Sequence, residues 1–265
     1  MLKHKILLTN DDGVYSAGLR ASYEVLSEIG EVHVVVPVLQ KSGVGRSISI
    51  MEPIRIFELN IEGMKVYAID GTPTDAVILG IHVIIKKVPD LVVSGINLGE
   101  NISTEAVTTS GTIGAALEAA TQGSPAIAIS LELPEYEKFE YSYKPINFSL
   151  AKRVLRFFSE NVLKKGMPTG VDVLNINIPL NSNGEIEITK LARRLYKTRV
   201  EERKDPRMRK YYWIDGIEVE EADEGSDLYA LRKGKVSVTP ITLDSTAKIN
   251  FNELKNWLGN LEVKL

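Results

Sequence analysis

Short, almost continuous apolar segments alternate with segments of helical period along the first two thirds of the chain. Six apolar segments are bounded by Gly, Pro or polar residues, and each is too short for a typical helix: KILLTN (5–10), EVHVVVP (31–37), KVYAID (65–70), DLVVSGIN (90–97), PAIAISL (125–131) and DVLNINIP (172–179). Runs of Val, Ile and Leu of this length are typical of strands that are buried on both faces. The sequence therefore predicts the strands of a covered sheet.

Amphipathic segments occupy the intervals between these strands. They run from Ser16 to Ile29, Pro73 to Lys87, Thr109 to Gln122 and Phe148 to Lys165. Strands that alternate with helices through short connections predict an α/β fold with a doubly wound, mostly parallel sheet. SISIMEPIRIFEL (47–59) departs from this pattern, because its apolar residues recur at every second position. We interpret this segment as an inserted β-hairpin.

The character of the sequence changes at about Lys190. Between Lys190 and Lys210 there are ten Lys and Arg residues against three acidic ones, and an acidic segment, EVEEADEGSD (218–227), follows. The apolar segment GKVSVTPI (234–241) then predicts a strand that returns to the sheet, and a final helix is expected from Asn252 to Leu258. We therefore predict a main domain at 1–189, an extended β arm at 190–240 and a C-terminal helix segment at 241–265, all within one continuous unit.

Composition excludes several classes of protein. The chain has 265 residues and a formal net charge of −3, which gives no overall field that would attract nucleic acid or an anionic membrane. Cysteine is absent, so disulfides, thiolate metal sites and cysteine nucleophiles are excluded. The first residues lack a signal-peptide pattern and no apolar run is long enough to cross a bilayer. We therefore expect a soluble, cytoplasmic protein without nucleic-acid or membrane partners.

Polar residues accumulate where the predicted strands end. In open α/β sheets, ligands bind outside the carboxyl ends of the strands. The residues at these ends are Asn10, Asp11, Asp12 and Gly13 after the first strand, VLQKSGVGRS (38–47) with Ser42, Arg46 and Ser47 after the second, GTPTD (71–75) after the third, Asn97 at the end of the fourth, and Ser110, Gly111 and Thr112 at the start of a helix. This accumulation predicts one ligand site at that edge of the sheet.

Each of these groups also has a purely structural interpretation. GTPTD has the pattern of a capping box with Pro at the first helical position. The segment 110–112 is either a tight helix start or a nest of backbone N–H groups for a phosphate. Ser42 and Asn97 occur equally well in turns, and one of the two aspartates would suffice as a helix cap. These alternatives stay open at the level of the sequence.

A divalent cation would explain the two adjacent carboxylates, because carboxylates side by side repel each other unless a positive charge lies between them. All candidate ligands carry oxygen donors: Asp11, Asp12, Ser42 and Asn97. The histidines lie away from the strand ends, at His4, His33 and His82. An oxygen-only site with two carboxylates suits Mg²⁺ or Mn²⁺ and disfavours zinc. Such a cation could polarise a phosphoryl oxygen or activate a water molecule.

Seven motifs in this order resemble the SurE survival-protein family. They are TNDDGV (9–14), KSGVGRSISI (41–50), GTPTDAV (71–77), VSGINLGENI (93–102), SGTIGAALEA (110–119), LNINIP (174–179) and SDLYALRKGKVSVTPI (226–241). The resemblance implies a metal-dependent phosphatase that acts on nucleoside 5′- and 3′-monophosphates. It also implies a Rossmann-like catalytic domain at 1–189 with an arm exchanged between subunits, so that the partner is a second copy in a homodimer or homotetramer. Short polyphosphate remains a possible further substrate.

The resemblance also implies roles for particular residues. The metal ligands would be Asp11, Asp12, Ser42 and Asn97, which hold one Mg²⁺ or Mn²⁺ per subunit. Ser110 and Thr112 would contact the phosphate. Two residues depart from the familiar pattern: Thr109 stands where an aromatic residue or His is usual, and Arg46 stands where His is frequent.

We predict direct attack on phosphorus by a metal-activated water, with Asp11 and Asp12 as the catalytic residues. Asp12 is expected to orient or deprotonate the water. The residues expected to contact the substrate are Asn10, Asn97, Ser110, Gly111, Thr112, Arg46 and Ser47.

Three other functions are compatible with parts of the sequence. An aspartyl-phosphate phosphatase would use Asp11 as the nucleophile, although such enzymes usually have Asp-x-Asp spacing. A non-catalytic metal- and nucleotide-binding protein would keep the same pocket without turnover. A nucleic-acid binder would use the basic segment 190–210, but the acidic segment that follows it favours an oligomerisation arm.

Overall fold

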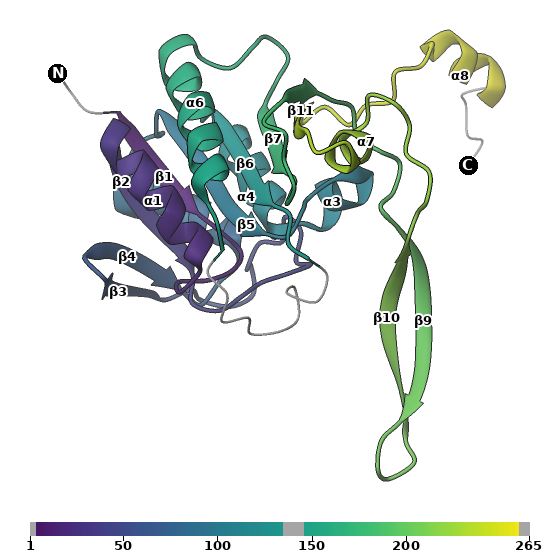
Figure 1. Ribbon diagram of the computed structural model, residues 1–265, viewed down its shortest axis with the longest axis horizontal. Helices are drawn as coiled ribbons and strands as arrows, with labels where there is room; N and C mark the ends of the chain where they lie inside the picture. The colour runs from purple at the N-terminus through teal and green to yellow at the C-terminus, as the bar shows by residue number, and fades with distance from the viewer. Residues whose placement is uncertain (1–3, 135–145, 260–265) are drawn as a thin grey trace, which may run out of the picture.

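The computed structural model describes residues 4–134 and 146–259, and its main feature is a nine-stranded sheet. The strands lie in the order β3-β4-β2-β1-β5-β6-β7-β11-β8 (Figure 1). Their bounds are β1 Lys5–Thr9, β2 Glu31–Pro37, β3 Ile56–Ile61, β4 Met64–Ile69, β5 Leu91–Leu98, β6 Ala126–Leu131, β7 Val173–Ile178, β8 Ile186–Ile188 and β11 Val236–Ile241. The chain moves outward from β1 to one side and then returns to β5 on the other. The topological switch point therefore lies between β1 and β5.

The centre of the sheet is parallel and buried, which confirms the predicted fold class. Strands β4, β2, β1, β5, β6 and β7 all run in the same direction. Only the flanks include antiparallel pairs, β3 with β4 and β11 with β7. Every residue of β6 and β7 is buried, as expected for strands that are covered on both faces.

Helices cover both faces of the sheet. One apolar cluster joins the sheet to α1 (Ala17–Ile29) and α6 (Ser149–Lys165), which lie in front of it in Figure 1. A second cluster joins the other face to α2 (Pro73–Leu79), the π-helical turn η1 (Gly80–Ile85) and α4 (Gly111–Thr121). The other helices among the described residues are α3 (Ser103–Thr109), α7 (Asp227–Arg232) and α8 (Phe251–Leu258). The four predicted amphipathic segments are thus confirmed, with η1 continuing the segment after α2.

The interpretation of residues 47–59 as a hairpin is wrong. The hairpin is formed by β3 and β4, and residues 47–55 form no strand. The turn explains the difference, because Glu62 and Gly63 both have positive φ, at 50° and 85°. Two such residues form the turn that matches the twist of a two-residue hairpin. The alternation over 47–51 does not reflect a buried face, since Ile50 and Met51 are 83% and 93% exposed.

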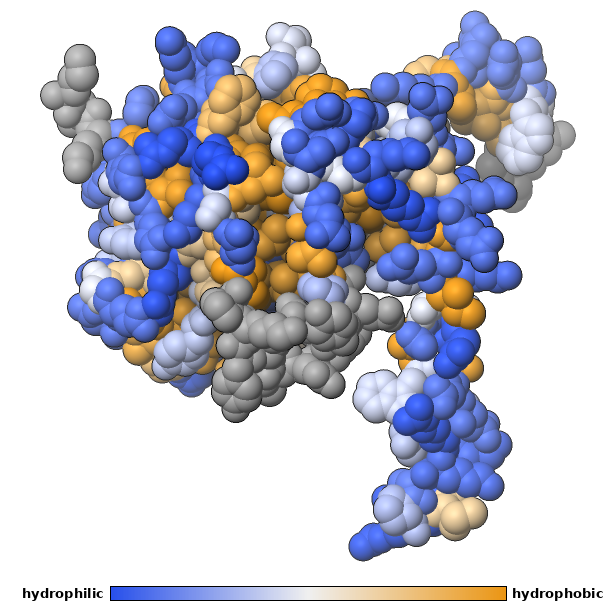
Figure 2. Space-filling model, viewed as in Figure 1, coloured by the Kyte–Doolittle hydropathy of each residue, from blue (hydrophilic) through white to orange (hydrophobic). Residues whose placement is uncertain are grey.

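The predicted arm is a separate two-stranded sheet formed by β9 (Tyr196–Lys204) and β10 (Lys210–Glu218). It projects away from the main body in Figure 1, and Figure 2 shows that hydrophilic residues dominate most of its visible face. A third small apolar cluster lies at its root and is formed by Ile102, Ala192, Leu195, Leu228 and Leu231. After the arm, β11 returns to the main sheet as predicted.

The final helix begins one residue earlier than predicted, and all of its side chains are exposed. Among the described residues, no helix has the length and apolar character that crossing a membrane requires.

Candidate functional site

Asn10 shapes the turn that places the two aspartates at the end of β1. Its side-chain amide donates to the Gly13 carbonyl at 3.0 Å, and the Gly13 amide donates to Asn10 Oδ1 at 3.3 Å. Gly13 has a φ of +90°, which favours glycine. The Asn10 side chain is fully buried and engaged in this turn. Its predicted contact with a substrate stays a prediction.

Asp11 is held by helix α4 and by the loop after β2. The Thr112 hydroxyl donates to Asp11 Oδ1 at 2.7 Å, and the Lys41 amide donates to the Asp11 carbonyl at 2.7 Å. Gly111 allows this approach, because a Cβ atom there would lie 2.9 Å from the Asp11 Cβ. The helix start at 110–112 and the first aspartate therefore come together, as the strand-end rule predicts.

Asp12 reaches the end of β5. The Leu98 amide donates to Asp12 Oδ2 at 3.2 Å, and the Ser16 hydroxyl also bonds this carboxylate. Asn97 therefore immediately precedes a residue that contacts Asp12. The Asn97 side chain is 9% exposed and its Nδ2 donates to the Gly99 carbonyl at 2.7 Å. The predicted role of Asn97 Oδ1 as a metal ligand stays a prediction.

Burial makes the charged forms of both aspartates costly. It raises the pKa of Asp11, and it raises the pKa of Asp12 to about 7, with the neighbouring Asp11 charge as the second cause. A cation between the carboxylates would favour their charged forms.

Among the residues that the structure describes, no three His, Cys, Asp or Glu side chains are grouped to hold a metal. The other ligands must then be hydroxyl, amide or water oxygens, and such a donor set fits Mg²⁺ or Mn²⁺.

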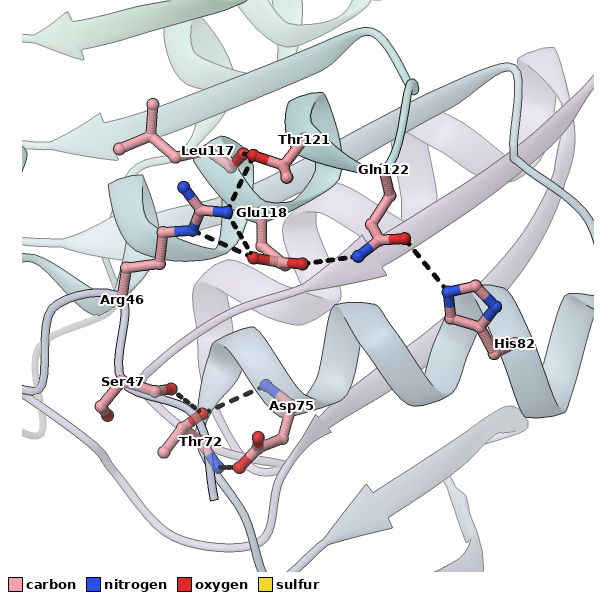
Figure 3. Close-up of polar contacts among 9 residues, drawn as sticks. All are labelled: Arg46, Ser47, Thr72, Asp75, His82, Leu117, Glu118, Thr121 and Gln122. Carbon is pink, nitrogen blue, oxygen red and sulfur yellow. Dashed lines mark hydrogen bonds and ion pairs between the residues drawn. The ribbon is translucent and has the colours of Figure 1, made fainter. Parts of the chain in front are cut away.

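The loop after β2 contains Ser42, Arg46 and Ser47. Ser42 Oγ accepts a hydrogen bond from Gln40 Nε2 at 2.9 Å, and its side chain is exposed. Arg46 is paired with Glu118 of α4, and the Ser47 carbonyl accepts from the Thr72 hydroxyl at 2.7 Å (Figure 3). Both residues therefore have protein partners in this structure. Their predicted contacts with a substrate stay predictions.

The capping interpretation of GTPTD is confirmed. Thr72 and Asp75 form a capping box at the start of α2, with Pro73 at the first helical position. Ser110 is likewise the N-cap of α4, and its Oγ accepts from the Ile113 amide at 3.2 Å. A phosphate contact of Ser110 would be an additional role and stays a prediction.

Sequence reasoning missed three groups at the site: the Ser16 hydroxyl, the Leu98 amide and the Lys41 amide. Only Ser16 left a signal, because it is the N-cap of α1 and follows the aspartates closely. The other two are backbone groups, whose positions depend on how neighbouring strand ends meet.

The fold and the site together define a class: a doubly wound α/β protein with two adjacent carboxylates at the switch point, one buried and one half-buried, beside a helix N-terminus. Comparisons with known proteins narrow this class. Residues 6–198 match the family described as survival protein SurE. The chain belongs to the SurE family.

Individual relatives match almost the whole chain. A 5′-nucleotidase SurE from Archaeoglobus fulgidus is 60% identical over 97% of this chain and 98% of its own length. A 5′-nucleotidase SurE from Methanosarcina mazei is 55% identical over 96% and 97%. The crystal structure of the SurE protein from Aquifex aeolicus has a TM-score of 0.79 and 37% identity, and the match covers 96% of this chain and 99% of that one.

Proposed function

We propose that this protein is a 5′-nucleotidase that hydrolyses nucleoside 5′-monophosphates to a nucleoside and phosphate. The observation that carries the proposal is the adjacent carboxylate pair beside the N-terminus of α4, formed by the buried Asp11 and the half-buried Asp12. The names of the archaeal relatives supply the substrate class. The substrates extend to nucleoside 3′-monophosphates, with short polyphosphate as a further candidate.

Asp11, Asp12, Ser42 and Asn97 would hold one Mg²⁺ or Mn²⁺ ion per chain. When bound, the ion supplies a water of lowered pKa and polarises the phosphate. The protein keeps both carboxylates in fixed orientations, because Thr112 donates to Asp11 and the Leu98 amide donates to Asp12. Asp12 would orient the attacking water or accept its proton. The backbone N–H groups at the start of α4 face the developing negative charge.

The test is phosphate release from a panel of nucleoside 5′- and 3′-monophosphates and short polyphosphate, with Mg²⁺, Mn²⁺ or EDTA. We expect metal-dependent release that is lost in Asp11→Asn and retained in Asp215→Asn, a matched change on the exposed arm. Nucleotide binding without release under every condition would reject the proposal in favour of a non-catalytic binding protein. A phosphoryl-enzyme trapped by acid quench would reject direct attack by water in favour of an Asp11 nucleophile.

We also propose that the arm joins copies of this chain into a homodimer or homotetramer. Its two strands pair only with each other in the described structure, and several of its apolar side chains are exposed: Val200, Tyr212, Trp213, Ile214 and Ile217. An isolated two-stranded hairpin is marginally stable in water. Sedimentation equilibrium tests the proposal, and a monomer at micromolar concentration would reject it.

A further inference from the structure

The Gly-rich loop after β2 is fastened to helix α4 by one ion pair (Figure 3). Arg46 Nε and Nη2 both donate to Glu118 Oε2, at 3.0 and 2.7 Å, and Nη2 also reaches the Thr121 hydroxyl at 2.8 Å. The Glu118 side chain is 4% exposed, whereas that of Arg46 is 35% exposed. A partly exposed loop residue is therefore held by a buried carboxylate of the helix.

Glu118 is itself held from the other side. Gln122 Nε2 donates to Glu118 Oε1 at 2.7 Å, and Gln122 Oε1 lies 3.1 Å from His82 Nε2 (Figure 3). Both oxygens of the Glu118 carboxylate thus have partners, one on the loop and one on the next turn of α4. This arrangement fixes the direction in which the carboxylate receives Arg46.

The backbone next to Arg46 lies against the last residue of α3 and the first turn of α4. The Gly45 amide donates to the Thr109 carbonyl at 2.8 Å, and a Cβ atom on Gly114 would lie 2.6 Å from the Gly45 carbonyl oxygen. The Arg46–Glu118 pair adds a side-chain attachment next to this backbone contact. The loop therefore contacts α4 through residues 45–46. This contact lies within one turn of Thr112, which bonds Asp11.

The same loop is attached to the aspartates at its other end. The Lys41 amide donates to the Asp11 carbonyl at 2.7 Å. Ser42 follows Lys41 directly and is exposed. The predicted metal ligand therefore lies on a short span between the Lys41 amide at one end and the contacts of Gly45 and Arg46 at the other.

We propose that Arg46 and Glu118 are a positioning pair that holds the loop 42–47 against α4 and so keeps Ser42 beside Asp11. Arg46 then acts through the loop rather than by touching the substrate phosphate. This proposal rests on the proposed function only for the role of Ser42 as a metal ligand.

The kinetic test compares Arg46→Gln, Glu118→Gln and the double variant, with rates measured against Mg²⁺ concentration. Loss of either partner releases the same loop, so we expect all three to need about tenfold more Mg²⁺ for half-maximal rate. The rate of Glu118→Gln at saturating Mg²⁺ should stay within about twofold of wild type. Arg46→Lys should need less Mg²⁺ for half-maximal rate than Arg46→Gln, because lysine keeps the positive charge. Arg203→Gln removes an ion pair on the arm and should need the same Mg²⁺ concentration as wild type.

Hydrogen exchange of the metal-free protein gives a second readout that needs no turnover. The amides of residues 42–47 should exchange faster in all three variants, while those of β5 stay protected. Thr121→Val removes the third contact of Arg46, together with a hydrogen bond to the Leu117 carbonyl within α4, and should give a smaller change in the same residues. This variant and Arg46→Gln change partly exposed side chains, so the test does not depend on how Glu118→Gln folds.

Two results would overturn the proposal. Unchanged exchange at 42–47 in Arg46→Gln would show that the pair does not hold the loop. A rate lost in Arg46→Gln but kept in Glu118→Gln would show that Arg46 contacts the substrate directly. Wild-type protein that releases no phosphate, yet shows faster exchange in the variants, would reject the proposed function and support the positioning role.

Discussion

The carboxyl end of the sheet and the projecting arm differ in how their side chains are covered and bonded. At the sheet end, Asp11 is buried and bonded by Thr112 of a helix that lies about a hundred residues further along the chain. On the arm, the backbones of the two strands pair only with each other in the described structure, and Trp213 and Ile214 are 58% and 81% exposed. The first region is completed by its own chain, whereas the second presents apolar surface without cover in the described structure.

This difference reflects two separate requirements, a preorganised site and a surface for a partner. A catalytic pair must be preorganised, and the doubly wound sheet does this by bringing β1, β5 and α4 to one point. An arm that joins subunits needs a partner surface instead, and exposed apolar side chains mark such a surface. Activity at the site should therefore be sensitive to the loss of a single hydrogen bond or charge. Assembly through the arm should change only when a large part of the arm is removed.

The largest expected effect comes from Asp11→Asn. This substitution removes one charged ligand, and we expect phosphate release to fall by about a thousandfold, since metal assistance contributes several kcal/mol. Steady-state rates at saturating Mg²⁺ check this. A rate within tenfold of wild type would place the chemistry elsewhere, and Asp215→Asn on the arm serves as the control.

Stability of the metal-free protein should fall as pH rises. Because the pKa of Asp12 is raised to about 7 in the folded protein, the folded state holds a proton that the unfolded state has already lost. The unfolding free energy should then decrease by a few kcal/mol between about pH 4 and pH 7. Asp12→Asn should flatten this slope. Urea unfolding in EDTA measures it, and an equal slope in the variant would contradict the burial effect.

A smaller effect is expected from Thr112→Val. The variant keeps the shape of the side chain but removes the hydrogen bond to Asp11 Oδ1. Loss of such an orienting bond typically costs about ten- to a hundredfold in metal affinity or activity. Titration of the rate with Mn²⁺ checks it, and Thr198→Val on the exposed β9 should behave as wild type.

The smallest effect on turnover should follow from shortening the arm. The Val219 amide donates to the Leu195 carbonyl at 2.9 Å, so residues 196–218 can be replaced by a two-residue Asn-Gly turn. We expect turnover per chain within about twofold of wild type, because no site residue is removed. Sedimentation should show a smaller assembly. A turnover loss as large as that of Thr112→Val would mean that the arm contributes to the site.

The strand-end rule located Asp11, Asp12, Asn97 and the segment 110–112 from sequence because parallel strands end at one edge. The sequence could not show that Arg46 pairs with Glu118, since this contact joins residues 72 positions apart through packing of a loop on a helix. The hairpin was misplaced for a related reason. Alternation at 47–51 indicates a strand only if a partner strand lies beside it, and the Glu62–Gly63 turn pairs β3 with β4 instead.

The most direct test of the central claim is equilibrium dialysis of Mn²⁺ against three proteins: wild type, Asp11→Asn and the variant with the shortened arm. The claim is that the site is built by the sheet end alone. It predicts a single bound ion per chain in wild type and in the shortened variant, and none in Asp11→Asn. Equal binding by Asp11→Asn, or loss of binding on shortening the arm, would contradict it.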